Sequence, residues 1–82
     1  VEETSVSYVV SGELEIYLEN ERKSVIPRIV SDSEFRLVFG QTSAVVPAGE
    51  HKVVDLKLTQ GTNALTCYGT GNITFIYQEG SL

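Results

Sequence analysis

The sequence is poor in the residues from which catalytic and metal sites are most often built. Its 82 residues include one histidine, one cysteine and no tryptophan or methionine. A single cysteine cannot form an internal disulfide, and a lone thiol fits folding in a reducing cytosol better than secretion. Zinc needs several protein ligands, and His51 and Cys67 lie two predicted strands apart. We therefore expect no catalytic residue, no metal ligand and no cofactor.

Basic residues are also scarce. Six Lys and Arg stand against eleven Asp and Glu, which gives a net charge of −5. The six are scattered along the chain, whereas nucleic acids and anionic membranes require clustered cations. No apolar run approaches the roughly 20 residues that cross a bilayer, and no signal-like segment opens the chain. The sequence predicts neither a nucleic-acid nor a membrane partner, and we interpret the acidic excess as a solvated surface.

No long stretch has the apolar spacing of an amphipathic helix, and alternation takes its place. The clearest case runs from Glu13 to Glu19, where Leu14, Ile16 and Leu18 share one face and the acidic residues and Tyr17 share the other. The same rule indicates about seven or eight short strands at regular spacing in one domain over residues 1–82, with Pro27 at an edge or at a strand start. The expected fold is all-β, an antiparallel two-sheet sandwich or jelly roll. The expected strands are Val6–Val10, Glu13–Glu19, Val25–Val30, Glu34–Phe39, Ala44–Val46, Glu50–Leu58, Ala64–Tyr68 and Ile73–Tyr77.

Glycines mark the expected turns. Ser11-Gly12 predicts a two-residue hairpin, and a β-meander is expected over residues 55–82, with turns at Gly61-Thr-Asn63 and Gly69-Thr-Gly-Asn72. A primed turn or a bulged loop requires a left-handed residue, so Gly69 or Gly71 should have positive φ. Residues 20–24 are expected to form a charged loop. Alternation predicts a core of Leu14, Ile16, Leu18, Ile29, Phe35, Leu37, Phe39, Leu56, Leu58, Leu65, Cys67, Ile73, Phe75 and Tyr77.

We expect no catalytic or ligand-binding role for the remaining polar residues. His51 follows a Pro-Ala-Gly turn on a polar face, and Cys67 is expected in the core as a small apolar side chain. Glu13 and Glu15 share a face but are typical of a solubilising strand. Asp32 and Glu34 lack the loop pattern of a calcium site. No helix follows Gly69-Thr-Gly71, so it is not a phosphate-binding loop, and the sequon at residues 72–74 is too short to be informative.

The segment Gly61-Thr-Asn-Ala-Leu-Thr-Cys-Tyr-Gly-Thr-Gly-Asn-Ile-Thr-Phe-Ile-Tyr-Gln-Glu-Gly-Ser-Leu82 resembles the C-terminal end of siphophage distal tail (Dit-type) proteins. The shared pattern is G-x-N-x-hydrophobic, then G-[ST]-G, then hydrophobic-T-F-x-Y and a short tail ending in Leu. Residues 25–30 also resemble an x-P-x-I strand of that domain. The likeness is loose over residues 14–82 and close over residues 61–82, and only the turn glycines Gly61, Gly69 and Gly71 carry over position by position.

This resemblance implies a galectin-like β-sandwich that is structural and not catalytic. The chain would be the C-terminal part of a longer tail protein, folded in the bacterial host cytoplasm and assembled into the virion of a phage or prophage. Its partners would be other tail and baseplate proteins at the distal tail–baseplate junction. In that family a separate belt domain forms a hexameric ring, and nothing here matches the belt. A hexamer is therefore expected only of the full-length protein, with this domain monomeric or weakly associating.

A carbohydrate-binding β-sandwich is the alternative function. Sugar sites stack a ring on an exposed aromatic side chain and fix the hydroxyls with polar groups. Tyr8, Tyr17 and Tyr68 are the candidate stacking residues, although the chain has no tryptophan and no galectin-type sugar motif around His51. An enzyme is the least supported reading, because no nucleophile–base pair can be assembled from the sequence.

Overall fold

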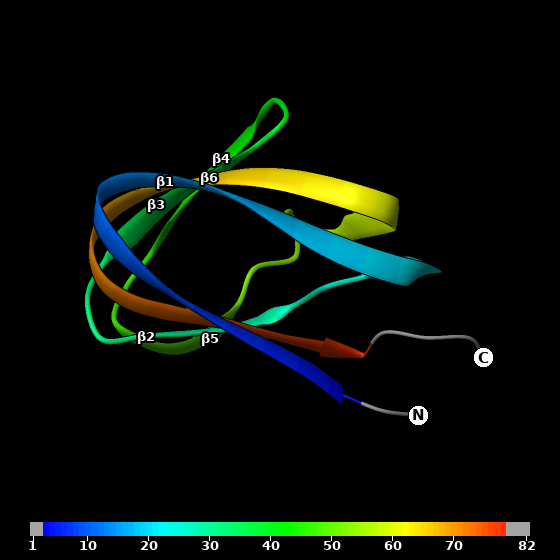
Figure 1. Ribbon diagram of the computed structural model, residues 1–82, viewed down its shortest axis with the longest axis horizontal. Helices are drawn as coiled ribbons and strands as arrows, with labels where there is room; N and C mark the ends of the chain where they lie inside the picture. Colours follow the sequence, from blue (N-terminus) through cyan, green and yellow to red (C-terminus); the bar gives the residue numbers. More distant parts are fainter. Residues whose placement is uncertain (1–2, 79–82) are drawn as a thin grey trace.

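The computed structural model describes residues 3–78, apart from the side chains of residues 21–23 and 78 (Figure 1). This part of the chain is all-β, as alternation predicts, and has no helix long and apolar enough to cross a membrane. It contains six strands in place of the seven or eight short ones expected, because two of them are long. The strands are β1 (Glu3–Val25), β2 (Arg28–Ser31), β3 (Phe35–Phe39), β4 (Thr42–Val46), β5 (Gly49–Lys52) and β6 (Leu58–Gln78).

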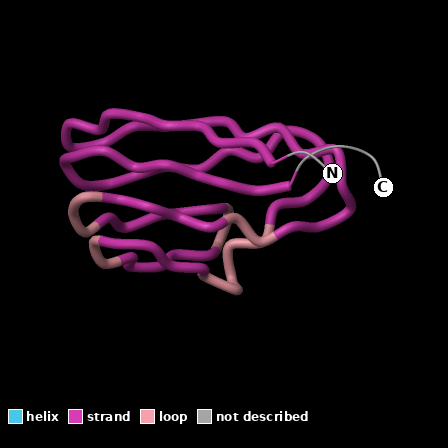
Figure 2. Tube along the Cα trace, turned by 90° about the horizontal axis from the view of Figure 1, so that it is seen from below, coloured by secondary structure: helices cyan, strands magenta, loops and turns pink. Residues whose placement is uncertain are grey.

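The strands pair in a nested order, the first with the last and so on inward. β1 pairs with β6, β2 with β5 and β3 with β4, all antiparallel, about the turn at residues 40–41. Short turns at residues 32–34 and 47–48 join β2 to β3 and β4 to β5, the second of them within the expected Pro-Ala-Gly turn. The strand predicted over Glu50–Leu58 is wrong, because β5 ends at Lys52 and the Leu56 amide donates to Val53 O at 3.1 Å in a turn. Figure 2 shows that strands make up most of the trace and that loops are short.

β6 holds the two halves of the molecule together because it pairs along both edges. One edge faces β1; the other faces β2, with Arg28 opposite Ile76, and β3, with Arg36 opposite Tyr68. The sheet order is β4-β3-β6-β2-β5, with β1 on the far side of β6. Pairing on both edges of a bent strand makes the sheet curl over until it is nearly closed into a barrel (Figure 1).

The turns predicted at Ser11-Gly12 and at Gly69–Asn72 are bends inside paired strands. β1 and β6 run unbroken through both places, and Gly12 lies directly opposite Gly69. The φ angles are 92° at Gly12, 149° at Gly69 and 144° at Gly71, so the predicted positive φ is confirmed while both hairpins and the β-meander are wrong. Paired glycines let two strands fold over together without losing their ladder. Figure 1 shows this shared bend at the left.

The β2–β3 connection holds the bend of β6 in place. The Asp32 carboxylate accepts hydrogen bonds from the Asn72 backbone N–H and from Asn72 Nδ2, both at 2.8 Å, and Asp32 N donates to Asn72 O at 3.2 Å. Ser33 Oγ donates to Thr70 O at 2.6 Å. These hydrogen bonds, first from the Asn72 side chain and then from its backbone, lower the pKa of Asp32. Glycine is favoured at position 71 because its φ is 144° and because a Cβ there would displace the side-chain tips of Asp32 and Ser33.

The turn predicted at Gly61–Asn63 is also part of β6. Gly61 has a φ of 107° and lies opposite Asn20, beside a register shift between Asn20 and Ser24. Asn63 is 2% exposed; its Oδ1 accepts from Thr59 N at 2.8 Å, and its Nδ2 donates to Thr59 O at 2.9 Å and Gly61 O at 3.2 Å. The loop expected at residues 20–24 is wrong, because β1 extends to Val25 and pairs with β6 again from Ser24. At the register shift, the buried Asn63 side chain bonds the backbone groups of Thr59 in place of a strand partner.

A single cluster of buried apolar side chains fills the curled sheet. All the predicted core residues belong to it except Leu14 and Phe39, which are half-buried, and it adds Val10 and Val46. Leu14 lies beside the bend, where Gly12 and Gly69 offer no side chains to cover it. Phe39 ends β3 next to the turn at residues 40–41. The cluster consists of Val10, Ile16, Leu18, Ile29, Phe35, Leu37, Val46, Leu56, Leu58, Leu65, Cys67, Ile73, Phe75 and Tyr77.

Candidate binding face

The residues most able to do chemistry lie apart from one another. His51 is half-buried on β5 with Nε2 3.3 Å from Ala48 O, and Cys67 is buried on β6. Burial raises the pKa of the Cys67 thiol to about 11, so this sulfur is protonated and a poor nucleophile at neutral pH. Among the side chains that the structure describes, which exclude those of residues 21–23, no group of three or more His, Cys, Asp or Glu could hold a metal ion.

The three candidate tyrosines do not form a platform. Tyr8 is half-buried and stands edge-on to Phe75, with ring centroids 6.3 Å apart and an interplanar angle of 67°. Burial, and then the neighbouring Cys67, raise the pKa of Tyr8. Tyr68 is half-buried on the outer side of β6, and the Arg36 guanidinium lies over its ring at 4.6 Å from the centroid. One face of the Tyr68 ring is therefore occupied by a cation.

Tyr17 is the tyrosine that presents its ring to solvent. It is 56% exposed, and its hydroxyl donates to Glu15 Oε1 at 2.9 Å. That hydrogen bond, and then the carboxylate charge, raise the pKa of Tyr17. Tyr17 lies opposite Ala64 on β6, four positions along the strand from Tyr68. A sugar ring stacked on Tyr17 would not also reach Tyr68, since four residues of strand span roughly 13 Å.

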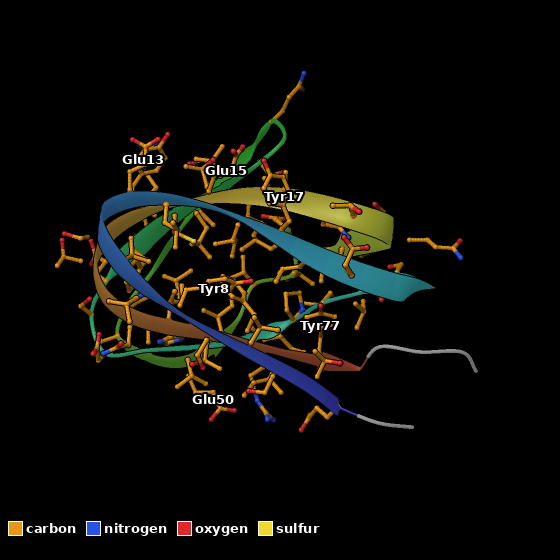
Figure 3. The ribbon with its side chains drawn as sticks, in the orientation of Figure 1. Tyr8, Glu13, Glu15, Tyr17, Glu50 and Tyr77 are labelled. Atoms are coloured by element: carbon orange, nitrogen blue, oxygen red, sulfur yellow. The ribbon has the colours of Figure 1, made fainter. Side chains whose placement is uncertain are left out.

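Tyr17 belongs to an outward-facing row on β1 that we call the acidic face, formed by Glu13, Glu15, Tyr17 and Glu19. Figure 3 shows Glu13 and Glu15 projecting from the ribbon, away from the interior where Tyr8 lies. The neighbouring β6 contributes Tyr68 opposite Glu13, and Thr62 Oγ1 donates to Glu19 Oε2 at 2.7 Å. Within the described part of the chain, no Lys or Arg forms an ion pair with these three carboxylates. The face can therefore attract cations from outside the described part of the chain.

A second feature, which the sequence did not indicate, is a cleft of about 330 Å³ beside Arg28. Its walls include Ile76, Lys52 and Glu3, and Arg28 Nη2 lies 3.8 Å from Glu3 Oε2. Arg28 Nε lies 3.0 Å from Glu50 Oε2, but its angle falls short of a hydrogen bond. The pairing of β2 with β5 and β6 brings these residues together from distant parts of the chain. The charges largely cancel, so the cleft shows no preference for one ligand class.

Neither the protein-family models nor the curated proteins include a match to this chain. Among solved structures, the chain is similar to a solution NMR structure of a de novo designed double-stranded β-helix, with a TM-score of 0.53 and 18% sequence identity. The alignment covers 98% of this chain and 100% of the designed one. At this identity the likeness concerns the fold alone.

Proposed function

We propose that the chain is a non-catalytic interaction module that docks onto other proteins. The observation that carries this proposal is the acidic face, where exposed carboxylates and the exposed Tyr17 stand together on a strand that pairs with β6 along its length. Tyrosine is enriched at protein interfaces because it combines a large apolar ring with a polar tip. Carboxylates without internal ion pairs steer a basic partner towards the same face.

The proposed setting is the tail of a phage or prophage, at the distal tail–baseplate junction. This part of the proposal rests on the sequence resemblance over residues 61–82. The finer architecture proposed is a galectin-like sandwich of two layers. One layer combines β2 and β5 with the part of the β1–β6 pair around residues 73–76. The other combines β3 and β4 with the part around residues 66–68. The pairings of β6 with β2 and with β3 support this division. The partners would then be tail and baseplate proteins.

The test starts from the genes beside the one that encodes this chain. Their products are co-expressed with it, and complexes are measured by size-exclusion chromatography with light scattering. We expect a stoichiometric complex with a neighbouring tail protein, weakened when Glu13 and Glu15 are replaced by Lys. The matched control replaces Glu34 and Asp55 by Lys, which makes the same change in net charge at two exposed positions outside the acidic face. Neighbouring genes unrelated to tails would overturn the setting, and the absence of any complex would overturn the docking function.

Carbohydrate binding is the second candidate, and the exposed Tyr17 ring beside Glu15 favours it. A glycan array followed by calorimetry tests it directly. Binding that is lost in Tyr17→Ala but retained in Tyr8→Ala would place a sugar on the Tyr17 ring and reverse the ranking. An array without a reproducible hit would leave protein docking as the function to test.

A further inference from the structure

The free edge of β1 is the longest unpaired strand edge in the described part of the molecule. β1 spans Glu3–Val25 and pairs along one edge with β6 only, whereas β6 has partners on both of its edges. β4 and β5 also end the sheet, but each is far shorter. Natural sheets keep edge strands short or protect them, since an unpaired row of N–H and C=O groups is a template for another strand. The length of β1 is therefore a feature that requires an explanation.

The side chains of β1 indicate which residues a partner strand added along its free edge should have. Outward, the edge bears Glu13, Glu15 and Glu19, which have no cationic partner among the described residues. Inward, the alternate positions are apolar, with Ile16 and Leu18 buried. A strand added beside them would place every second residue next to a carboxylate and the intervening ones next to the rim of the core.

The same charges select against a second copy of this chain. Two β1 edges paired with each other would bring carboxylates to adjacent positions on one face, and like charges across a ladder are destabilising. A strand with Lys or Arg at alternate positions would replace that repulsion by attraction. Charge complementarity therefore favours a basic partner strand over self-pairing.

We propose that the free edge of β1 around residues 13–19 binds, by strand addition, an extended segment of a partner protein in which Lys or Arg alternate with apolar residues. This inference rests on the proposed function as a protein-docking module and specifies how the partner docks. Backbone hydrogen bonds along the edge would supply affinity, and the acidic face would supply charge selectivity.

The experiment uses the whole chain and three synthetic peptides. The first alternates Lys and Val, the second replaces each Lys by Glu, and the third is the Lys–Val peptide with alternate backbone nitrogens methylated. The third keeps the charges but cannot complete a ladder. We expect the first peptide to bind, the second not to bind, and the third to bind about tenfold more weakly or worse, since several hydrogen bonds are lost.

Amide hydrogen exchange locates the peptide. We expect the Lys–Val peptide to slow exchange at β1 amides around residues 13–19 and not in β4 or β5. Replacing Glu13, Glu15 and Glu19 together by Lys changes exposed positions only and should transfer binding from the Lys–Val to the Glu–Val peptide.

Three results would overturn the proposal. The first is equal binding of the methylated and unmethylated peptides, which indicates docking on the face and not on the edge. The second is no binding of the Lys–Val peptide; a complex with a neighbouring gene product would then still stand as evidence for the docking function. The third is a dimer of the free chain with β1 amides protected, which would show that a second copy occupies the edge.

Discussion

Gly12 and Gly69 are direct partners across the β1–β6 ladder, and both have positive φ at the bend of the two strands. A Cβ on Gly69 would lie 2.8 Å from Phe35 Cδ1 and 2.9 Å from Glu34 O, and Cβ atoms in folded proteins do not approach other heavy atoms so closely. The bend therefore depends on glycine for its conformation and, at Gly69, also for space.

Gly69→Ala should destabilise the fold by roughly 1–3 kcal/mol, because alanine meets both the strained φ and the aromatic ring of Phe35. Denaturant unfolding followed by far-UV circular dichroism measures the change. Thr70→Ala, at the exposed neighbouring position, is the matched control and should change stability by less than about 0.5 kcal/mol. Equal stability of the two variants would mean that the bend does not need glycine.

Asn63→Leu should cost roughly 1–3 kcal/mol even though leucine is close in size and apolar. The substitution removes the Oδ1 that accepts from Thr59 N and the Nδ2 that donates to Thr59 O and, inside the fold, to Leu18 O. The comparison is with Thr62→Ala, whose side chain bonds Glu19 at the surface. Calorimetric midpoints that rank Thr62→Ala as the more damaging change would contradict the role assigned to the buried amide.

Phe75→Ala should lower the free energy of unfolding by roughly 3–5 kcal/mol, since the ring is fully buried and also contacts Tyr8 edge-on. Phe39→Ala removes the same atoms from a half-buried position at the end of β3 and should cost clearly less. Urea unfolding of the two variants compares their free energies of unfolding. Since both lose a phenylalanine ring, the difference between them reports the effect of burial. A loss under about 1 kcal/mol at Phe75 would remove it from the core.

The hydrogen bonds between Asp32 and Asn72 should make stability depend on acidity. Folding lowers the pKa of Asp32, so its contribution is fully present above the pKa of an unfolded aspartate, about 3.9, and is lost as pH falls through the folded value. Asp32→Ala should therefore be less stable than the parent protein at neutral pH, and the gap should narrow below about pH 4. Thermal unfolding of both proteins across this range provides the measurement. A gap that stays constant with pH would show that the charge of Asp32 does not stabilise the bend.

Cys67 should react slowly with a thiol reagent at mildly alkaline pH. Burial raises its pKa to about 11, and the reactive thiolate is therefore rare as well as shielded. Labelling in native buffer, followed by absorbance, should be slower than labelling in denaturant by orders of magnitude. Prompt labelling of the folded chain would place Cys67 at the surface.

Alternation along the chain was sufficient to predict the all-β class and most of the core. Ile16, Leu65 and Phe75 are buried as expected because burial on a strand depends on the phase of the alternation, which is a local property. Alternation does not decide which of two adjacent apolar residues is buried. Val10 is buried and Val9 is 77% exposed, and the continuous register of β1 with β6 decides between them.

Glycine and asparagine signals, in contrast, left the topology undecided. A positive φ at Gly12, Gly69 and Gly71 serves equally well for a hairpin that reverses one strand and for a bend that two paired strands make together. The outcome depends on whether β1 remains paired with β6 across the bend, and that pairing joins residues from opposite ends of the chain.

The candidate sites also have features that the sequence shows and features that only the tertiary structure shows. The alternation of Glu13, Glu15, Tyr17 and Glu19 is visible in the sequence, because neighbours on one strand face share a spacing of two. That Tyr68 is covered by Arg36, that Arg28 lies between Glu3 and Glu50, and that β1 retains a free edge follow only from the tertiary structure. Cross-strand register between distant segments decides each of them, since no local spacing in the sequence specifies which strands become neighbours.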